Sequence, residues 1–200
     1  FGSHLDKIGF IGELKSMLSE FFQYGITAEV LEELVSEADK ENWSAMLKQK
    51  LNDMVVLHRA FKKYTEDKKC IVKEEILEML CRVLPDSELI RGSVVTLDGY
   101  TGFTPVQYRL LELLLQYCRR VVVTITMDPE ENPYRESGPS HLFHMSKHTV
   151  CRLTDLAAQT GAGREEDILL LQYPAYRFKN SPELQFIEKE LFRFRGRKYE

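Results

Sequence analysis

One acidic residue follows a short apolar run near the middle of the chain. The run is Val94–Leu97, and Asp98 ends it. Nucleotide-binding α/β folds place the aspartate that coordinates Mg²⁺ at the C-terminal end of a buried strand. An ordinary buried strand that ends in an aspartate has the same sequence pattern. The acid therefore indicates a possible nucleotide site, but it does not identify one by itself.

The residues after Asp98 are more specific. Superfamily 1 DNA helicases of the UvrD type have the sequence Asp-Glu-x-Gln-Asp here, followed by a glutamine and a leucine-rich helix. Residues 98–111 resemble that motif without its catalytic members. Asp98 and Gln107 match, whereas Gly99 replaces the glutamate that orients the attacking water. Because hydrolysis needs that carboxylate, we expect Asp98 and Gln107 to be relics of a nucleotide and Mg²⁺ site, and the chain to contain no catalytic residue.

The whole string around Asp98 resembles the AddB family. The matching residues are Asp98-Gly99-Tyr100 and Phe103-Thr104-Pro105, followed by Gln107-Tyr108. Flanking segments fit as well, namely residues 9–10, 24–26, 48–64 and 178–192. AddB is the second subunit of the bacterial AddAB (RexAB-type) helicase-nuclease, and its amino-terminal half resembles a helicase that has lost translocation activity. The likeness covers essentially the whole chain but only a fraction of a subunit.

The resemblance implies a role in processing DNA double-strand breaks for repair by homologous recombination in the cytoplasm. The parent subunit would act with an AddA-type helicase-nuclease as its motor, on single-stranded and double-stranded DNA. ATP with Mg²⁺ and an iron–sulfur cluster are cofactor candidates for the parent, outside this chain, and none is expected here. The inactive helicase-like region would guide single-stranded DNA or recognise a regulatory sequence in it.

Hydrophobic periodicity, together with this resemblance, predicts an α/β fold with two parts. Residues 1–90 are predicted as a helical insertion subdomain (1B-like), and residues 91–200 as part of a RecA-like, P-loop NTPase-type domain with a parallel sheet. The sequence shows no phosphate loop. The glycine-rich residues 161–163 are not one, because they lack the Gly-Lys-Ser/Thr ending. The predicted helices are residues 9–24, a helix capped by Thr27, 43–64, 73–84, a helix capped by Thr104 with Pro105 first, 147–159 and 182–192. The predicted strands are 94–97 and 121–127, both buried on two faces, and 168–173.

The loop Gly99–Thr104 is the predicted DNA contact. Ligands of open α/β sheets bind beyond the C-terminal ends of the strands. Tyr100 and Phe103 provide rings that stack on bases, and Thr101 provides a hydroxyl for a phosphate or a base edge. The alternative is that both rings fill the space between the loop and the following helix.

Composition argues against a protein that binds nucleic acid by net charge. The 200 residues have a net charge of −4, and 44% of them are hydrophobic, which is enough for a core. Basic residues gather at 62–69 and in the tail 193–198. Each segment is compatible with phosphate contact, but a solvated rim at 62–69 and a frayed terminus at 193–198 are the alternatives. No apolar run is long enough to span a membrane.

Cysteine and histidine spacing predicts no metal site. The four cysteines are Cys70, Cys81, Cys118 and Cys151, and they form no CxxC pair. Free thiols are expected, with Cys81 and Cys118 buried. His141, His144 and His148 lack a third ligand. The acidic segment 128–131 shows no pattern of partners, so a solvated part of a mobile loop is expected there.

Two other classes of function are open from the sequence. A working ATP-dependent superfamily 1 helicase is disfavoured by Gly99, because a glutamate at this position would be required. A purely structural protein-interaction module is the other class. A phosphate-loop lysine upstream and a nuclease domain downstream would identify the family.

Overall fold

The computed structural model describes residues 9–170, 176–191, 193 and 195–199. The chain divides into two compact units. The first contains the chain up to residue 126 and residues 133–163, and the second contains residues 127–132 and the chain from residue 164 onward. None of the helices in the described part of the chain is long and apolar enough to cross a membrane.

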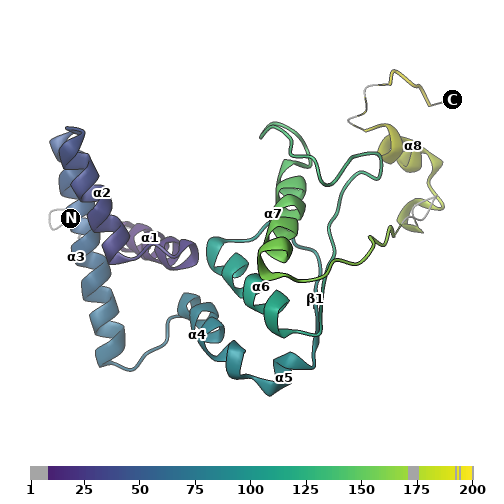
Figure 1. Ribbon diagram of the computed structural model, residues 1–200. Helices are drawn as coiled ribbons and strands as arrows, with labels where there is room; N and C mark the ends of the chain where they lie inside the picture. The colour runs from purple at the N-terminus through teal and green to yellow at the C-terminus, as the bar shows by residue number, and fades with distance from the viewer. Residues whose placement is uncertain (1–8, 171–175, 192, 194, 200) are drawn as a thin grey trace. The chain divides into compact units, whose positions relative to one another are not determined.

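Unit 1 begins with the three helices expected from the sequence (Figure 1), although the third begins two residues later and ends three residues later than predicted. They are α1 (Phe10–Tyr24), α2 (Ala28–Lys40) and α3 (Ala45–Asp67). Thr27 caps α2, because its hydroxyl oxygen accepts a hydrogen bond from the Val30 N–H at 3.4 Å. Gly25 ends α1 in the left-handed conformation, with φ 68°. Both assignments confirm the sequence prediction.

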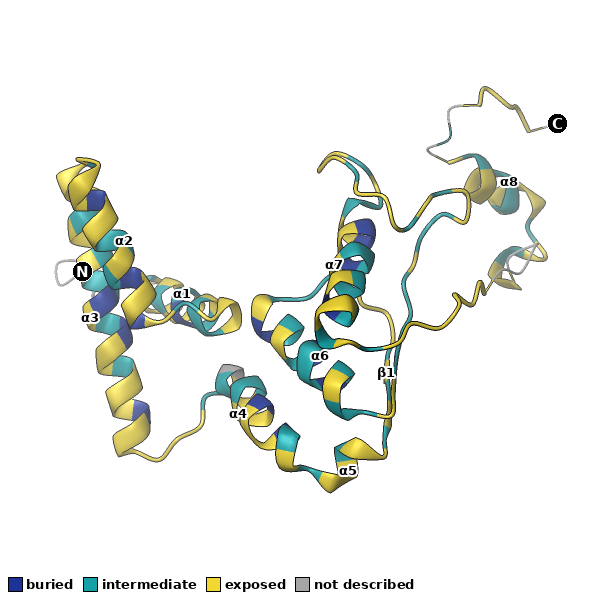
Figure 2. Ribbon diagram, in the orientation of Figure 1, coloured by how far each residue is buried: buried dark blue, intermediate teal, exposed yellow. Residues whose placement is uncertain are grey.

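Helices α2 and α3 form a hairpin. Leu31 and Ala38 of α2 are buried, as is Val55 of α3, and Figure 2 shows buried residues as narrow stripes along otherwise exposed helices. Two ion pairs join the helices, Lys48–Asp39 at 3.0 Å and Arg59–Glu32 at 2.6 Å. The later residue of α3, Arg59, pairs with the earlier residue of α2, Glu32. This order shows that the two helices run antiparallel.

The remaining elements of unit 1 form an α/β arrangement. In chain order they are η2 (Lys73–Glu75), α4 (Ile76–Val83), η3 (Leu84–Asp86), α5 (Glu88–Arg91), β1 (Val94–Leu97), α6 (Pro105–Tyr117), β2 (Arg120–Val123) and α7 (His144–Thr160). Strands β1 and β2 pair in parallel, with Val95 opposite Val121. The predicted α/β class is therefore confirmed, as a largely helical unit with a small two-stranded parallel sheet. The RecA-like assignment and the division near residue 90 remain predictions.

One face of α6 forms the core of this arrangement. Leu111 and Leu114 of α6 are buried with Leu84, and Val95, Leu97 and other apolar side chains pack around them. Helices α4 and α7 also contact α6. Burial of these side chains on one side of the sheet fixes the position of the loop between β1 and α6.

The expectation of strands buried on both faces was wrong. Exposed and half-buried residues alternate along β1, and Val94 is 54% exposed. The apolar residues of β1 pack on the core from one face only, as in a sheet with one covered side. Strand β2 ends at Val123 rather than at residue 127. Its partner β1 ends at Leu97, so residues 125–127 have no β1 residue opposite them.

Unit 2 contains η4 (Tyr176–Phe178) and α8 (Pro182–Glu190). The strand predicted at 168–173 was wrong for residues 168–170, which form no regular structure, and residues 171–173 lie outside the described residues. Ile168, Leu169 and Leu170 are all exposed, so this apolar run has no sheet to join within the described part of the chain. Helix α8 ends at Glu190, two residues before the predicted end, and residue 192 is not among those described.

His58 is buried between α1 and α3 without a polar partner. Its ring is 3% exposed, and neither ring nitrogen forms a hydrogen bond with any described residue. The ring lies against two phenylalanines of α1, with centroids 5.3 Å from Phe22 and 6.3 Å from Phe21. Burial lowers the pKa of His58, and the charge of Lys62 lowers the pKa further, against a smaller opposing effect of Glu29.

Acid should therefore destabilise the protein through His58. As the pH falls through about 6.5, the unfolded chain gains a proton at His58 while the folded chain stays neutral, so the free energy of unfolding falls. We expect His58→Phe to flatten the pH dependence of the urea midpoint between about pH 7.5 and 5. Leu31→Ala, at a buried residue of α2 that carries no titratable group, is the control and should lower the midpoint without changing its pH dependence. Equal slopes for wild type and His58→Phe would contradict the prediction.

Candidate nucleic-acid interface

A single hydroxyl joins the ends of the two strands. Thr124, just after β2, donates its hydroxyl hydrogen to the Asp98 carboxylate. The same oxygen accepts the Gly99 N–H at 3.3 Å. The carboxylate at the end of β1 thus has a structural partner on the neighbouring chain segment, and the first peptide group of the loop is held by the same contact.

Gly99 also has a backbone conformation that disfavours the glutamate of an active helicase motif. Its φ is +79°, in the left-handed region, where a residue with a Cβ is strained. Nothing lies within 4 Å of the position that a Cβ would take, so the constraint comes from the backbone and not from crowding. The loop geometry is consequently adapted to glycine at this position.

Gln107 has a role at the start of α6. Its side-chain oxygen accepts the Thr104 N–H at 2.8 Å, and the Thr104 hydroxyl oxygen accepts the Gln107 N–H at 3.4 Å. This reciprocal pair is a capping box, and Pro105 occupies the first turn. The predicted cap of α6 is confirmed. Asp98 and Gln107 are thus each hydrogen-bonded to a local structural partner, and the idea that they are relics of a nucleotide site stays a prediction.

Three aromatic rings form a continuous row from the loop to α6. Tyr100 stacks on Phe103, with centroids 5.1 Å apart and planes inclined by 22°. Phe103 meets Tyr108 of α6 edge-on, at 5.6 Å and 69°. Tyr100 is 41% exposed, whereas Phe103 is half-buried and packs against the core around Leu111. Of the two rings predicted to contact DNA, Tyr100 is thus the more accessible, and Phe103 supports it.

Helix α7 holds the middle of the loop. The buried Thr149 donates its hydroxyl hydrogen to the main-chain oxygen of Thr101 at 3.0 Å. A Cβ at Gly102 would come within 3.1 Å of the Met145 side chain, so the loop approaches α7 closely. The Thr101 side chain remains exposed. The loop therefore presents Tyr100 and Thr101 from a backbone fixed at both ends and in the middle.

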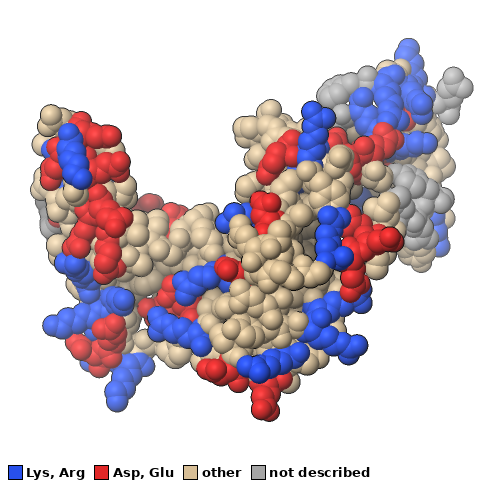
Figure 3. Space-filling view, viewed as in Figure 1, with Lys and Arg blue, Asp and Glu red and all other residues tan. Residues whose placement is uncertain are grey.

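Surface charge does not mark a nucleic-acid site. Figure 3 shows basic and acidic side chains interspersed over the visible face of unit 1. Such mixing agrees with the net charge of −4. Any affinity of this surface for DNA would consequently depend on stacking and hydrogen bonds more than on a positive field.

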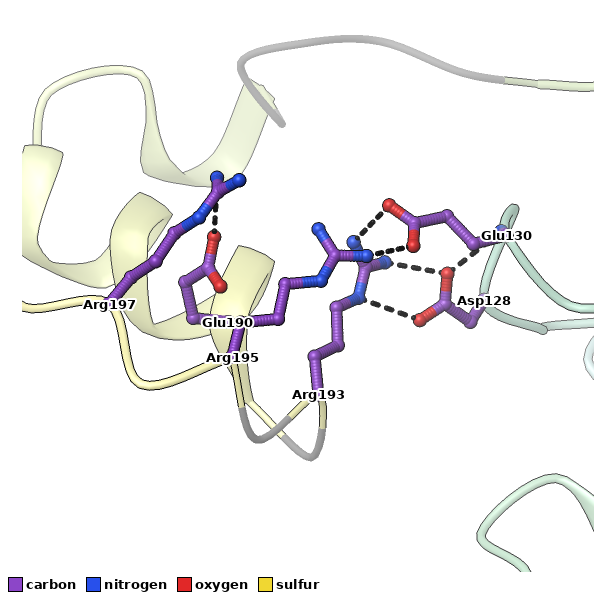
Figure 4. A network of polar contacts seen from close by, with 6 residues as sticks. All are labelled: Asp128, Glu130, Glu190, Arg193, Arg195 and Arg197. Atoms are coloured by element: carbon purple, nitrogen blue, oxygen red, sulfur yellow. Dashed lines mark hydrogen bonds and ion pairs between the residues drawn. The ribbon is translucent and has the colours of Figure 1, made fainter.

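The basic tail pairs with acids inside unit 2 (Figure 4). Arg193 donates to both carboxylate oxygens of Asp128, at 3.0 and 2.6 Å, and to Glu130 at 2.7 Å. Arg195 contacts Glu130, and Arg197 lies 3.4 Å from Glu190. The expectation that the acidic segment 128–131 has no partners was therefore wrong, because the matching cations lie more than 60 residues away in the sequence.

Asp128 illustrates the electrostatics of this network. Burial acts to raise the pKa of its carboxyl group, but the Glu130 N–H and the Arg193 guanidinium outweigh that effect and lower the pKa. With its side chain only 12% exposed, Arg193 is already engaged by carboxylates. Arg193 would thus have to give up these ion pairs before it could bind a phosphate.

The residues described show no group of three or more histidines, cysteines, aspartates or glutamates arranged to hold a metal. His144 contacts the Ser137 main-chain oxygen at 2.7 Å, and His148 contacts Glu136 at 3.1 Å. The four cysteines are free thiols, of which Cys81 is buried, Cys118 half-buried and Cys70 exposed. Burial raises the pKa of the Cys81 thiol. The iron–sulfur cluster that the resemblance places outside this chain stays a prediction.

Comparison with known proteins identifies the family. The family described as ADDB, N-terminal, matches residues 1–188. The chain belongs to the AddB N-terminal family. A protein of Lachnoclostridium phytofermentans, named as an ATP-dependent helicase/deoxyribonuclease subunit, is 38% identical over 97% of this chain. Proteins of the same name from Clostridium acetobutylicum and Desulforudis audaxviator are 35% and 33% identical over 93% and 100% of the chain. The chain spans only 17%, 15% and 17% of these three relatives.

Sequence reasoning missed the residues that fix the loop. Thr124 was assigned to the interior of a strand, and Thr149 lies in a helix with no motif around it. Both act through hydroxyl contacts to segments 26 and 48 residues away. Tyr108 was included in the family string, but nothing in the sequence indicated that its ring continues the row from Tyr100.

The contact between Asp98 and Thr124 should contribute to stability. Thr124→Val and Asp98→Ala should each lower the free energy of unfolding by about 0.5–1.5 kcal/mol, measured by urea denaturation. The double variant should cost little more than the larger single change, because both remove one shared interaction. Thr96→Val, at an exposed threonine of β1, is the matched control. Strictly additive effects would show that the two side chains do not depend on each other.

Proposed function

We propose that this chain is a non-catalytic, helicase-like part of a helicase-nuclease subunit, and that it contacts single-stranded DNA through the loop Gly99–Thr104. The observation behind this proposal is the exposed Tyr100 ring, stacked on Phe103 at the C-terminal end of β1. Bases of a single strand stack on such rings without sequence preference. The backbone contacts of Gly99 and Thr101 hold the loop in place before single-stranded DNA binds.

The loss of catalysis is part of the proposal. An ATP site needs a carboxylate that orients water and a loop that cradles phosphates. Gly99 stands where the water-orienting carboxylate would be, and its φ disfavours a glutamate. The sequence also contains no phosphate-loop motif. The hydroxyl of Thr124 also donates a hydrogen bond to Asp98, which is the acid that matches the helicase motif. These residues do not fit a working ATP and Mg²⁺ site, so a working ATP-dependent helicase is the less favoured alternative.

The names of the relatives support a proposal for the biological role. Their name describes one subunit of a helicase and deoxyribonuclease, and a protein named as one subunit requires a companion. We infer an AddA-type helicase-nuclease as that companion and double-strand break repair by homologous recombination as the process. In such an assembly the region would guide the single strand produced by the motor, or recognise a regulatory sequence in it. A structural interaction module without DNA contact is the remaining alternative.

Tyr100→Ala should weaken binding of a fluorescein-labelled single-stranded dT oligonucleotide by about fivefold or more. The loss should persist at raised salt, because stacking does not release counterions. Lys68→Ala should weaken binding only at low salt. Tyr24→Ala, at a tyrosine that is 55% exposed, should bind like wild type. If Tyr100→Ala also binds like wild type, with an unchanged circular dichroism spectrum, the loop does not contact DNA.

The chain should hydrolyse no ATP, with or without single-stranded DNA, because it lacks the water-orienting glutamate and a phosphate loop. A coupled assay for ADP release is the measurement, with buffer and an Asp98→Ala variant as references. Turnover above buffer that disappears in Asp98→Ala would instead support an active helicase site.

A further inference from the structure

A groove between α6 and α7 lies beside the aromatic row of the loop. Its volume is about 320 Å³, within the range of small-ligand sites. The groove is lined by Pro105, Tyr108, Arg109, Glu112, Arg152 and Leu156. The first four follow one face of α6 at helical spacing, and the last two are one turn apart on α7. Tyr108 is both a wall of the groove and the last ring of the row that begins at Tyr100.

Arg152 brings an unneutralised positive charge to this groove. Its guanidinium carbon lies 5.9 Å from the centre of the Tyr108 ring, which is cation–π distance. Among the described residues no carboxylate forms an ion pair with Arg152, in contrast to Arg193 of unit 2. A guanidinium at cation–π distance from an aromatic ring still has N–H groups that suit a phosphate.

Two further features favour an anion at the same end of the groove. Arg109 reaches Glu78 only at 4.0 Å and is 55% exposed, so its charge is weakly neutralised. The groove also borders the first turn of α6, where the helix dipole is positive. Together with Arg152, these features give this end of the groove a positive potential.

Glu112 adds a carboxylate to the groove one helical turn after Arg109. The side chain is half-buried, and the described residues provide no ion-pair partner for it. Three residues of an α-helix rise by about 4.5 Å, so this carboxylate lies close to Arg109 along the helix axis. A half-buried carboxylate with free acceptors suits a ligand that donates N–H groups, such as the exocyclic amine of cytosine.

We propose that this groove binds one nucleotide of single-stranded DNA, next to the base that stacks on Tyr100. The phosphate contacts Arg152, with Arg109 nearby, and Glu112 accepts a hydrogen bond from an amino group on the base edge. The inference rests on the proposed single-strand binding at the loop, and it adds a preference for bases with an exocyclic amine. Thymine, which presents a carbonyl at the corresponding position, is disfavoured.

The test compares fluorescein-labelled dC12 and dT12 on the 200-residue chain over a range of salt concentrations. Wild type should bind dC12 about fivefold or more tightly than dT12, and Glu112→Ala should abolish that preference. Arg152→Gln should reduce the salt dependence of log K by about 0.7, the value for one phosphate contact on a single strand. Glu88→Ala and Arg82→Gln, at exposed positions of α5 and α4, are the matched controls.

The outcomes separate this inference from the function on which it rests. Binding that depends on Tyr100 but shows no preference for dC12, with an unchanged salt slope in Arg152→Gln, would leave loop binding intact and remove the groove site. An equal loss in Arg152→Gln and Arg82→Gln would indicate non-specific attraction and also contradict the inference. Absence of binding to either oligonucleotide would overturn both proposals. Thermal unfolding and circular dichroism of each variant establish that the fold is retained.

Discussion

Burial of one face of α6 is the constraint on which unit 1 depends. Leu111 and Leu114 pack with Leu84 and with the inward residues of β1, and each such leucine contributes on the order of 2 kcal/mol when fully buried. The sheet has only two strands, which would be marginal without a helix against it. Because α6 begins directly after the loop, the same packing that stabilises the unit also fixes where Tyr100 is presented.

The polar residues that resemble a helicase motif have structural partners in this loop. Asp98 is bonded to Thr124 across the strand ends, and Gln107 closes the capping box of α6 with Thr104. Both side chains would have to leave these contacts, or share them, to bind a nucleotide and its metal. Asp98 and Gln107 thus each contribute to the local structure of the loop and of the start of α6.

Local signals in the sequence predicted the local structure well. Thr27, Thr104 and Gly25 ended or began helices where expected, because caps depend on a few adjacent residues. Solvent exposure was harder to predict. The residues of β1 are apolar enough for a fully buried strand, but burial depends on how many strands and helices surround them. The contacts of Thr149 and Arg193 join segments 48 and 65 residues apart, and no periodicity in the sequence reports such distant pairs. The apolar run at 168–170 was misassigned for the same reason.

The distribution of charge distinguishes Arg193 of unit 2 from Arg152 of unit 1. In unit 2, Arg193 is held by two carboxylates, so a phosphate would have to displace existing ion pairs. In unit 1, Arg152 lies over a ring and has no carboxylate partner among the described residues, so a phosphate would have no ion pair to displace. The arginine-rich tail is the more obvious basic feature of the sequence, yet the single arginine on α7 is better placed to bind an anion. An anion would therefore meet a less engaged cation at Arg152 than at Arg193.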